Sequence, residues 1–241
     1  MRNPTVHGYD KLANSYRFFE KLMFGSDLEN ARTALLNSIP VCRSALILGD
    51  GNGRLLDALL SSQPGCEITS IDQSKKMLDI QQQRLSNHPL RGNVTWRHQD
   101  ARNFEGFENQ FDLLVSAFFL DCFTARDLET HLPRWLNSLR PGGLFYFVDF
   151  QEPDSGWKRM RSKLCLTAMH HFFRWQTDLP NRTLVNMNAA LDQCALEMLA
   201  SQNMSHDLIC TRLYRVLTVE ENDRSQAGRT QEKRQHQSSE E

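Results

Sequence analysis

Residues 45–53 read Ala-Leu-Ile-Leu-Gly-Asp-Gly-Asn-Gly, and this stretch decides the fold. Its apolar residues predict a buried strand, and its three alternating glycines predict a tight turn. Residues 54–60, Arg-Leu-Leu-Asp-Ala-Leu-Leu, follow with the apolar spacing of a helix. Glycines let a backbone approach a ligand closely, and the free N–H groups of the first helical turn face that ligand. A strand, a glycine turn and a helix in this order predict a nucleotide-type site.

Strand and helix patterns alternate along the rest of the first 150 residues. We expect strands at 44–48, 67–71, 94–98, 111–117 and 144–148, with helices at 53–61, 74–85 and 125–139 and a turn at Pro141-Gly142-Gly143. Further helices are expected at 156–176 and 184–201, followed by an antiparallel strand pair at 206–211 and 213–219. This alternation predicts an α/β fold, a doubly wound and mostly parallel sheet with helices on both faces.

The chain divides into three parts by pattern. Residues 1–40 are amphipathic and predict an N-terminal helical cap, broken near 25–27, whose second helix starts at Ser26 or Asp27. Residues 41–220 carry the alternating pattern, with a helical insertion at about 156–180. Residues 221–241 are polar and charged, which predicts a disordered tail.

Composition narrows the class of protein. The 241 residues carry a formal net charge of −1, which argues against nucleic acid as the main partner. No apolar run approaches the ~18–20 residues of a membrane span, and the N-terminus lacks the apolar core of a signal peptide. Six cysteines show neither C-x-x-C pairs nor zinc-ligand spacing. We therefore expect reduced, buried thiols, no metal site and a cytoplasmic location.

An acidic residue, Asp72, closes the second predicted strand, nineteen positions after Gly53. In doubly wound folds an acid at this place reaches the ribose hydroxyls of a nucleotide. The alternative is that Asp72 caps the helix that begins at Ser74. With the glycine turn beside it, we favour ligand binding.

The glycine spacing distinguishes between cofactor classes. A nicotinamide-type Gly-x-Gly-x-x-Gly turn starting at Gly49 would have its third glycine at 54, where Arg54 stands. Glycines at 49, 51 and 53 instead resemble the turn of class I S-adenosylmethionine-dependent methyltransferases. Segments resembling other motifs of that family are His-Gln-Asp-Ala at 98–101, Phe-Asp-Leu-Leu-Val-Ser at 111–116, the stretch 136–144, and Tyr-Asp-Lys-Leu-Ala at 9–13 with Tyr16. The resemblance covers about residues 9–219.

This resemblance implies a seven-stranded sheet whose last strand is antiparallel, and it implies a set of cofactor contacts. Gly49, Gly51 and Gly53 would contact the methionine part of S-adenosylmethionine, Asp72 its ribose, and Gln73, Asp100 and Ala101 its adenine, with Ser116 and Tyr16 also at the cofactor. Asp100 would receive the adenine amino group, and Ala101 would donate its backbone N–H.

One position departs from the family pattern. The family usually has an acid two residues before the first glycine, and this chain has Ile47 there. Asp50, inside the turn, is a candidate to face the ammonium group of the cofactor in its place; the alternative is that Asp50 only stabilises the turn. Arg54 is a candidate for the cofactor carboxylate, although an arginine at a helix start is also ordinary.

The substrate side is predicted beyond strands four and five, at 116–123 and 149–152. Asp121 is a candidate base or substrate contact, or a cap of the next helix. His170 and His171, on an aromatic-rich helical stretch, could accept a proton from a phenol or enol, or one could simply be exposed while the aromatics pack. The Asn/Asp-Pro-Pro-Tyr element of base- and amide-methylating members is absent after strand four.

These features predict a methyltransferase that uses S-adenosylmethionine to methylate oxygen or carbon of a small hydrophobic or aromatic molecule by in-line transfer. One alternative is a protein or tRNA methyltransferase, and only the basic cluster at 158–163 supports it. Another is a non-catalytic, methyltransferase-like scaffold subunit, supported by Ile47. A fourth uses the cofactor for cyclisation or decarboxylation. The sequence leaves the oligomeric state open.

Overall fold

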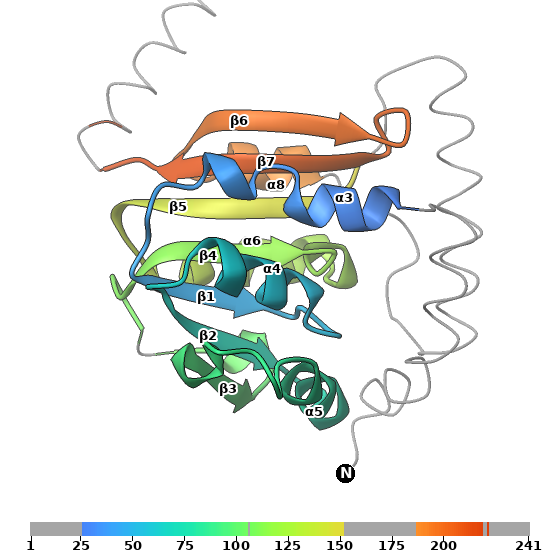
Figure 1. Cartoon of the computed structure of the whole chain (residues 1–241). Helices are drawn as coiled ribbons and strands as arrows, with labels where there is room; N and C mark the ends of the chain where they lie inside the picture. The colour runs from blue at the N-terminus through green and yellow to red at the C-terminus, as the bar shows by residue number, and fades with distance from the viewer. Residues whose placement is uncertain (1–25, 106, 152–186, 219–220, 222–241) are drawn as a thin grey trace, which may run out of the picture.

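A seven-stranded sheet forms the centre of the computed structural model, which describes residues 26–105, 107–151, 187–218 and 221 (Figure 1). The strands are β1 (Ser44–Leu48), β2 (Glu67–Asp72), β3 (Val94–His98), β4 (Phe111–Ala117), β5 (Leu139–Phe150), β6 (Leu196–Met204) and β7 (Ile209–Val216). Their order is β3-β2-β1-β4-β5-β7-β6. The first five strands pair in parallel, whereas β7 lies antiparallel between β5 and β6. The predicted, mostly parallel sheet with an antiparallel last strand is confirmed.

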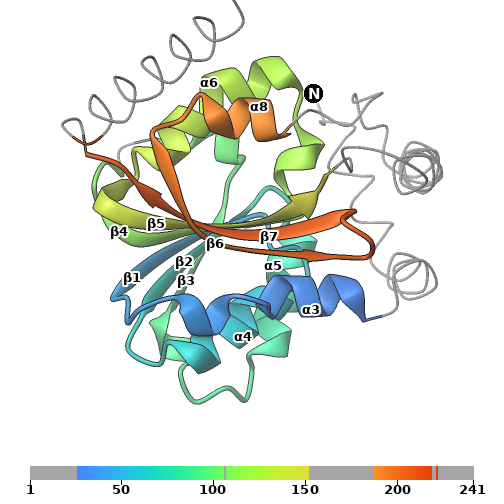
Figure 2. The same ribbon diagram turned by 90° about the horizontal axis from the view of Figure 1, so that it is seen from above.

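Helices cover both faces of the sheet (Figure 2). One face carries α3 (Asp27–Thr33), α4 (Arg54–Ser62) and α5 (Lys75–Arg84), and the other carries α6 (Ala125–Leu136) and α8 (Met187–Asp192). Short 3₁₀ helices span Leu36–Ser38, Arg91–Asn93, Ala101–Asn103 and Leu120–Cys122. Within the described ranges, no helix is long and apolar enough to cross a bilayer.

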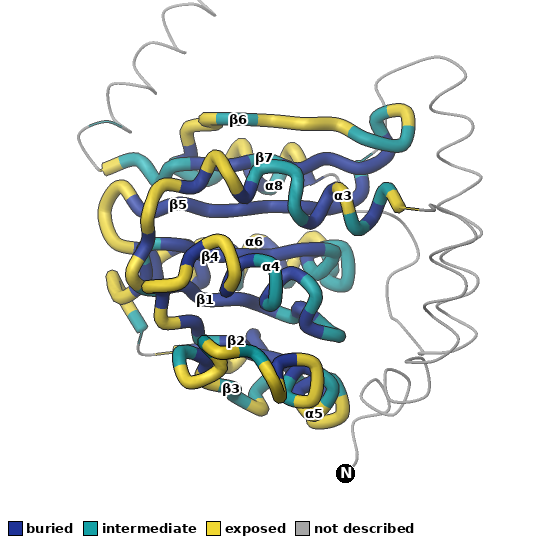
Figure 3. Tube along the Cα trace, in the orientation of Figure 1, coloured by how far each residue is buried: buried dark blue, intermediate teal, exposed yellow. Residues whose placement is uncertain are grey.

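Most of the sheet is buried (Figure 3), and a layer of buried apolar side chains packs on each of its faces. Successive side chains of a strand point to opposite faces. In β1, Ile47 therefore packs with the leucines of α4, while Leu46 packs in the layer that contains Trp135 of α6. Burial on both sides explains why residues 45–48 form a continuous apolar run. The two layers fix the end of β1, and with it the start of the glycine turn.

The prediction for residues 184–201 is wrong over its second half. Helix α8 ends at Asp192, and β6 begins at Leu196. Leu, Glu, Met and Ala at 196–200 favour a helix locally, but this segment pairs with β7 over its whole length, and pairing in a sheet overrides local propensity. The two strands expected at 206–211 and 213–219 both overlap β7, so the predicted bounds are wrong; the antiparallel partner of β7 is β6, at 196–204. Residues 205–207 form the connecting loop, all with positive φ.

Two other boundaries differ from the prediction. Strand β5 begins at Leu139 and includes the expected turn at 141–143, and α6 ends at Leu136. Leu139 pairs with Phe111, and a register shift follows before Leu113 pairs with Leu144. Gly142 has a φ of +75°, so the turn residues form an irregularity inside a longer strand.

The N-terminal helix α3 begins at Asp27 after Ser26, as predicted, although the Ser26 side chain makes no capping hydrogen bond to its backbone. Helix α3 is tied to the sheet, since Thr211 Oγ1 donates to the Ala31 carbonyl at 2.7 Å and the Tyr146 hydroxyl donates to the Arg32 carbonyl at 2.9 Å. The remainder of the predicted cap, the insertion at 156–180 and most of the tail lie outside the described residues. The proposed division of the chain stays a prediction.

Candidate functional site

The strand order reverses between β1 and β4, and ligands of doubly wound sheets bind outside the carboxyl ends of strands at such a reversal. Leu48 and Ser116 pair there, near the ends of the two strands. The glycine turn begins directly after Leu48, and the Gly49 N–H donates to the Ile71 carbonyl of β2 at 2.9 Å. The structure therefore places the turn at the reversal, with the ends of β2 and β4 on either side.

All three glycines of the turn have left-handed backbone conformations, with φ of +64° at Gly49, +60° at Gly51 and +78° at Gly53. Side chains are disfavoured in that region. At Gly49 packing adds a second requirement, because a Cβ would lie 2.1 Å from Cδ2 of Phe119. A Cβ at Gly51 would meet no atom within 4 Å. The backbone of the turn is thus packed at Gly49 and open at Gly51.

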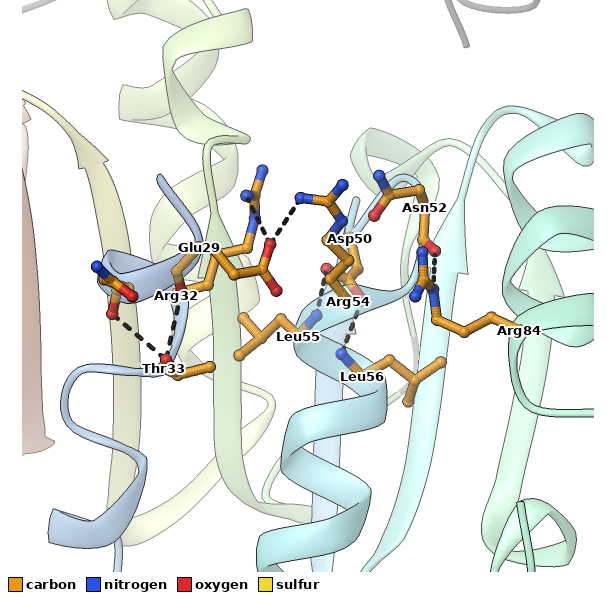
Figure 4. A network of polar contacts seen from close by, with 10 residues as sticks. Glu29, Arg32, Thr33, Asp50, Asn52, Arg54, Leu55, Leu56 and Arg84 are labelled. Atoms are coloured by element: carbon orange, nitrogen blue, oxygen red, sulfur yellow. Dashed lines mark hydrogen bonds and ion pairs between the residues drawn. The ribbon is translucent and has the colours of Figure 1, made fainter. Parts of the chain in front are cut away.

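Two side chains of α5, those of Gln81 and Arg84, donate hydrogen bonds to backbone carbonyls of the glycine turn. Gln81 Nε2 donates to the Gly51 carbonyl at 3.0 Å, while its Oε1 accepts from the Ser70 hydroxyl at 2.8 Å. Arg84 Nε donates to the Asn52 carbonyl at 2.8 Å (Figure 4). Sequence reasoning missed both residues. For Gln81 a signal existed, since it is a polar residue on the buried stripe of α5, between Leu78 and Leu85.

We expect Gln81→Leu to lower the free energy of unfolding by about 1–3 kcal/mol, because the Gly51 carbonyl and the buried Ser70 hydroxyl would lose their partner. Urea denaturation measures this change. Gln83→Leu is the matched control, since Gln83 is exposed on the same helix. If Gln81→Leu were as stable as the control, the Gln81 hydrogen bonds would not be what holds the turn.

Asp50 caps the helix that follows the turn. One carboxylate oxygen accepts from the Leu56 N–H at 2.8 Å and the other from the Leu55 N–H at 3.4 Å (Figure 4). Burial raises the pKa of Asp50 to about 6, against the opposing effects of these hydrogen bonds and of the nearby positive charge of Arg32. The turn-stabilising interpretation of Asp50 accounts for these contacts. The expectation that the first-turn N–H groups are free is wrong for Leu55 and Leu56, because Asp50 occupies them.

The raised pKa of Asp50 predicts a pH dependence of stability. The folded protein holds this proton more tightly than the unfolded chain, where the ordinary pKa is 3.8, so between about pH 4 and 6 the contribution of Asp50 to stability falls as pH rises. Asp50→Asn lacks this titration. We expect the unfolding free energy of the variant minus that of the wild type to rise by up to about 3 kcal/mol across this window, in urea titrations at each pH. A constant difference would contradict the assignment.

Arg54 pairs with the N-terminal helix. Its Nη1 lies 2.6 Å from Oε2 of Glu29 in α3, so the described structure gives this side chain a protein partner in place of the expected cofactor carboxylate (Figure 4). The same Glu29 oxygen lies 4.0 Å from Nη1 of Arg32. The guanidinium of Arg32 is buried and stands 4.8 Å from the centre of the Phe118 ring. Sequence reasoning missed Arg32, which joins α3, the glycine turn and the end of β4.

The departure from the family pattern has a structural explanation. Ile47 is 1% exposed and packs in the layer beneath α3 and α4. An apolar side chain suits that position, because a carboxylate placed there would need a partner. In this chain the buried acid next to the turn is Asp50.

Asp72 ends β2 and is buried. Its Oδ1 accepts from the Ser74 N–H at 2.8 Å, and Ser74 in turn caps α5 by accepting from the Met77 N–H. The alternative that Asp72 itself caps this helix is wrong, because Ser74 occupies the cap. Gln73, the next residue, is half-buried, and its carbonyl oxygen lies 3.1 Å from Nε2 of His98.

Asp100 and Ala101 follow β3 at the same edge. Partial burial raises the pKa of Asp100, but hydrogen bonds and charge from Arg102 outweigh it, and the pKa lies below its ordinary value. Both carboxylate oxygens accept from Arg102. The Ala101 carbonyl accepts from the indole N–H of Trp135 at 2.9 Å. Trp135 therefore fixes the backbone at the position predicted for the adenine.

The segment after β4 lies across the glycine turn. Phe118 has a φ of +52°, which is uncommon for a residue with a side chain. The Phe119 ring covers Gly49 and packs with Phe123 and Trp135 at centroid distances of 4.9 and 5.9 Å. Phe119 and Phe123 thus pack on Trp135 of α6. Ser116 is buried, and its Oγ has no hydrogen-bond partner among the described residues.

Two acidic residues meet beyond β4 and β5. Asp149 Oδ2 accepts from the Asp121 N–H at 3.2 Å, and its Oδ1 accepts from the Phe150 N–H at 2.8 Å. Burial raises the pKa of Asp121 to about 6, and burial together with the charge of Asp121 raises the pKa of Asp149 well above its ordinary value. Helix α6 is capped by Thr124, so Asp121 is not its cap. Asp149 lies in the segment 149–152 that the sequence places on the substrate side, but its contact with Asp121 was not predicted.

Three predicted site residues, Tyr16, His170 and His171, lie outside the described residues. Among the residues that are described, no group of three or more His, Cys, Asp or Glu side chains is arranged to hold a metal ion. The structure thus brings Gly49, Asp72, Asp100 and Ser116 to one edge of the sheet and adds Asp121 beyond β4.

Comparison with known proteins gives the same fold and family. Residues 45–143 match the family described as "Methyltransferase domain". A ubiquinone/menaquinone biosynthesis C-methyltransferase, UbiE of Azotobacter vinelandii, is 30% identical over 107 residues, 44% of this chain and 41% of that protein. The chain spans about a third to a half of the length of the curated relatives that it matches.

Solved structures agree over more of the chain. The N-methyltransferase NodS from Bradyrhizobium japonicum, in complex with S-adenosylhomocysteine, has a TM-score of 0.60 at 20% identity and covers 89% of this chain and 99% of its own. An O-methyltransferase family protein from Burkholderia thailandensis has a TM-score of 0.65 at 18% identity, covering 87% and 61%. The likeness to these structures shows the fold. Residues 45–143 thus belong to the methyltransferase-domain family, and the glycine turn at the reversal of the sheet supports the resemblance of the chain to class I S-adenosylmethionine-dependent methyltransferases.

Proposed function

We propose that this protein is an S-adenosylmethionine-dependent methyltransferase of a small, hydrophobic or aromatic molecule, acting on oxygen or carbon. The observation that carries the proposal is the glycine turn, which is left-handed at three glycines, open at Gly51 and followed across the sheet by Asp72. Glycines in this arrangement leave room for a ligand directly against the backbone.

The residues at the edge of the sheet fit S-adenosylmethionine. Gly51 leaves space for the methionine part, and Asp72 provides a carboxylate for the ribose hydroxyls. Gln73, Asp100 and Ala101 would hold the adenine. The buried hydroxyl of Ser116, which lacks a partner among the described residues, is a polar group that a ligand can satisfy. When bound, the cofactor supplies an activated methyl group on a sulfonium.

The protein has two tasks in such a reaction. It aligns the nucleophile with the methyl group and excludes water, for which the packed aromatic residues beyond β4 are suited. It also holds a proton when the nucleophile arrives as a hydroxyl. Asp121 is placed for this role beyond β4, and its pKa of about 6 makes it a better proton acceptor than an ordinary aspartate while it stays ionised at neutral pH. His170 and His171 are further candidates for the same task.

The substrate proposal rests on the aromatic side chains near this position. Phe118 and Phe150 lie with ring centroids 5.0 Å apart, beside the end of β4. The relatives named above methylate carbon, nitrogen or oxygen according to their names, so they support a methyltransferase without fixing the atom. The absence of an Asn/Asp-Pro-Pro-Tyr element favours oxygen or carbon.

Transfer of labelled methyl groups tests the proposal. The full-length protein is incubated with S-adenosylmethionine carrying a tritiated methyl group and a panel of phenols, quinols and enols, and tritium extracted into organic solvent is counted. We expect label in at least one hydrophobic substrate and a loss of it with Asp72→Ala. Label transferred instead to added tRNA or protein would favour the alternative of a macromolecular substrate. Cofactor binding without transfer to any acceptor would favour a non-catalytic subunit.

A further inference from the structure

Two cysteines lie against each other at the amino ends of β1 and β2, whereas the glycine turn lies at the carboxyl end of β1. Cys42 precedes β1 and Cys66 precedes β2, and their sulfur atoms are hydrogen-bonded at 3.3 Å. Cys42 is 4% exposed and Cys66 is fully buried, and both are free thiols. The Cys66 sulfur also donates to the Glu67 carbonyl at 3.7 Å, whereas the other cysteines of the described residues contact oxygen atoms alone: Cys122 at Asp121, Cys194 at Ala190 and Cys210 at Asp149.

The backbone around this pair is fixed by Gln63. Its side-chain oxygen accepts from the Cys42 N–H at 3.2 Å, and its own carbonyl accepts from the Cys66 N–H at 3.0 Å. The Glu67 N–H donates to the Arg43 carbonyl at 2.9 Å, which joins the two segments next to the cysteines. The approach of the two sulfurs therefore follows from the packing of β1 on β2. A disulfide has a sulfur–sulfur bond of about 2.05 Å, so the two sulfurs, now 3.3 Å apart, must approach by about 1.3 Å to form one.

The two thiols differ in acidity because of their contact. The hydrogen bond between the two sulfurs lowers the pKa of the Cys42 thiol, whereas the same hydrogen bond and burial raise the pKa of Cys66. The thiolate is the form of cysteine that attacks an oxidant. Cys42 is also the less buried of the two residues and follows Val41, which is 91% exposed. Cys42 is thus the attacking group and Cys66 the resolving one.

We propose that Cys42 and Cys66 are a modification site at which a small peroxide forms a reversible disulfide. The Cys42 thiolate attacks one oxygen of hydrogen peroxide, the O–O bond breaks, and a sulfenic acid and water result after protonation of the leaving hydroxide. The Cys66 sulfur, on losing its proton, attacks the Cys42 sulfur and displaces hydroxide, which takes up that proton as a second water. Two thiols are oxidised, and one peroxide is reduced to two waters.

The disulfide would close a loop that contains β1, the glycine turn and α4. Cross-linking such a loop reduces the conformational freedom of the unfolded chain and stabilises the folded one. We expect the oxidised protein to melt roughly 5–10 °C above the reduced protein. Dithiothreitol should reverse the shift. Cofactor binding is not required for either effect.

Peptide mapping tests the pairing. The folded, full-length protein is treated with hydrogen peroxide, denatured in N-ethylmaleimide and digested with trypsin without reduction. Cleavage after Arg32, Arg43, Arg54 and Lys75 places the two cysteines on separate peptides, 33–43 and 55–75, each with one cysteine. We expect these two peptides as a linked pair, in the wild type and in Cys210→Ser. The pair should be absent from Cys42→Ser and Cys66→Ser, and from protein reduced before denaturation.

The same digest contains the outcome that overturns the proposal. If the treated wild type gave both peptides singly, with maleimide on each cysteine, the pair would be inert to peroxide. A link from either cysteine to one at 122, 165, 194 or 210 would assign the oxidation to another pair. Both readings come from the wild-type protein, so they do not depend on whether the serine variants fold.

Discussion

Gly49→Ala is expected to destabilise the protein by roughly 2–5 kcal/mol and to abolish measurable binding of S-adenosylhomocysteine. The left-handed backbone at φ +64° costs a residue with a side chain about 1–2 kcal/mol. The added methyl group would also lie 2.1 Å from the Phe119 ring, which must move, and overpacking costs about 1–3 kcal/mol more. Urea denaturation and calorimetric titration measure the two effects.

Variants at two other glycines separate the effect of the left-handed backbone from the effect of the clash with Phe119. Gly65→Ala is the control, because Gly65 lacks the left-handed φ and a Cβ there meets no atom within 4 Å; we expect a change within 0.5 kcal/mol. Gly51→Ala has the left-handed strain without the clash, so we expect a loss of about 1–2 kcal/mol in stability. Its effect on ligand affinity should exceed its effect on stability. Equal stability of the Gly49 and Gly65 variants would contradict the packing of Phe119 on the turn.

Asp121→Asn is expected to lower the rate of methyl transfer to a hydroxyl substrate by about 100-fold, the scale of general base catalysis. In the wild type only the ionised carboxylate accepts a proton, so the rate should rise with pH through about 6, the pKa to which burial raises Asp121. The amide of the variant does not titrate, and this rise should disappear. The measurement is the pH profile of initial rates with the substrate found in the labelling screen.

Glu129→Gln provides the charge-matched control, because it removes one carboxylate from the exposed face of the next helix. Its rate and pH profile should equal those of the wild type. An Asp121→Asn enzyme with a wild-type rate and an unchanged profile would assign proton transfer to another group, and His170 and His171 would be tested next.

Much of the fold follows from local sequence. The apolar runs at 44–48 and 111–117 predict β1 and β4 to the residue, because a strand buried on both faces leaves a nearly continuous apolar pattern. The glycines at 49, 51 and 53 predict a turn at which all three adopt positive φ. Such features depend on a few neighbouring residues, and a single sequence contains them.

Pairing between distant segments is less visible in the sequence. Residues 196–204 contain good helix formers and lie at the sheet edge, exposed along most of their length, so neither periodicity nor propensity marks them as β6. Their structure is decided by β7, which follows in the chain and pairs with them. The end of α6 at Leu136 and the early start of β5 at Leu139 are likewise set by pairing with Phe111.

In the site, too, the sequence predicts local features but does not predict contacts between distant residues. Residue type and position place Gly49, Asp72 and Asp100 at the edge of the sheet correctly. The partners of a polar side chain depend on three-dimensional packing, so the pairing of Arg54 with Glu29 and the capping of α4 by Asp50 were not decided by the pattern. Gln81 and Asp149 act through contacts with distant backbone groups. The sequence marks Gln81 as a polar residue on a buried stripe and 149–152 as a segment near the site, but it does not indicate which groups these side chains contact.

Calorimetric titration with S-adenosylhomocysteine, of the wild type beside Asp72→Ala, tests the central claim most directly. Asp79→Ala, which removes an exposed carboxylate from the neighbouring helix α5, is the matched control. The account predicts micromolar binding by the wild type and by Asp79→Ala, and at least tenfold weaker binding by Asp72→Ala, a difference of about 1.4 kcal/mol. Failure of the folded wild type to bind, or equal affinity in all three proteins, would contradict it.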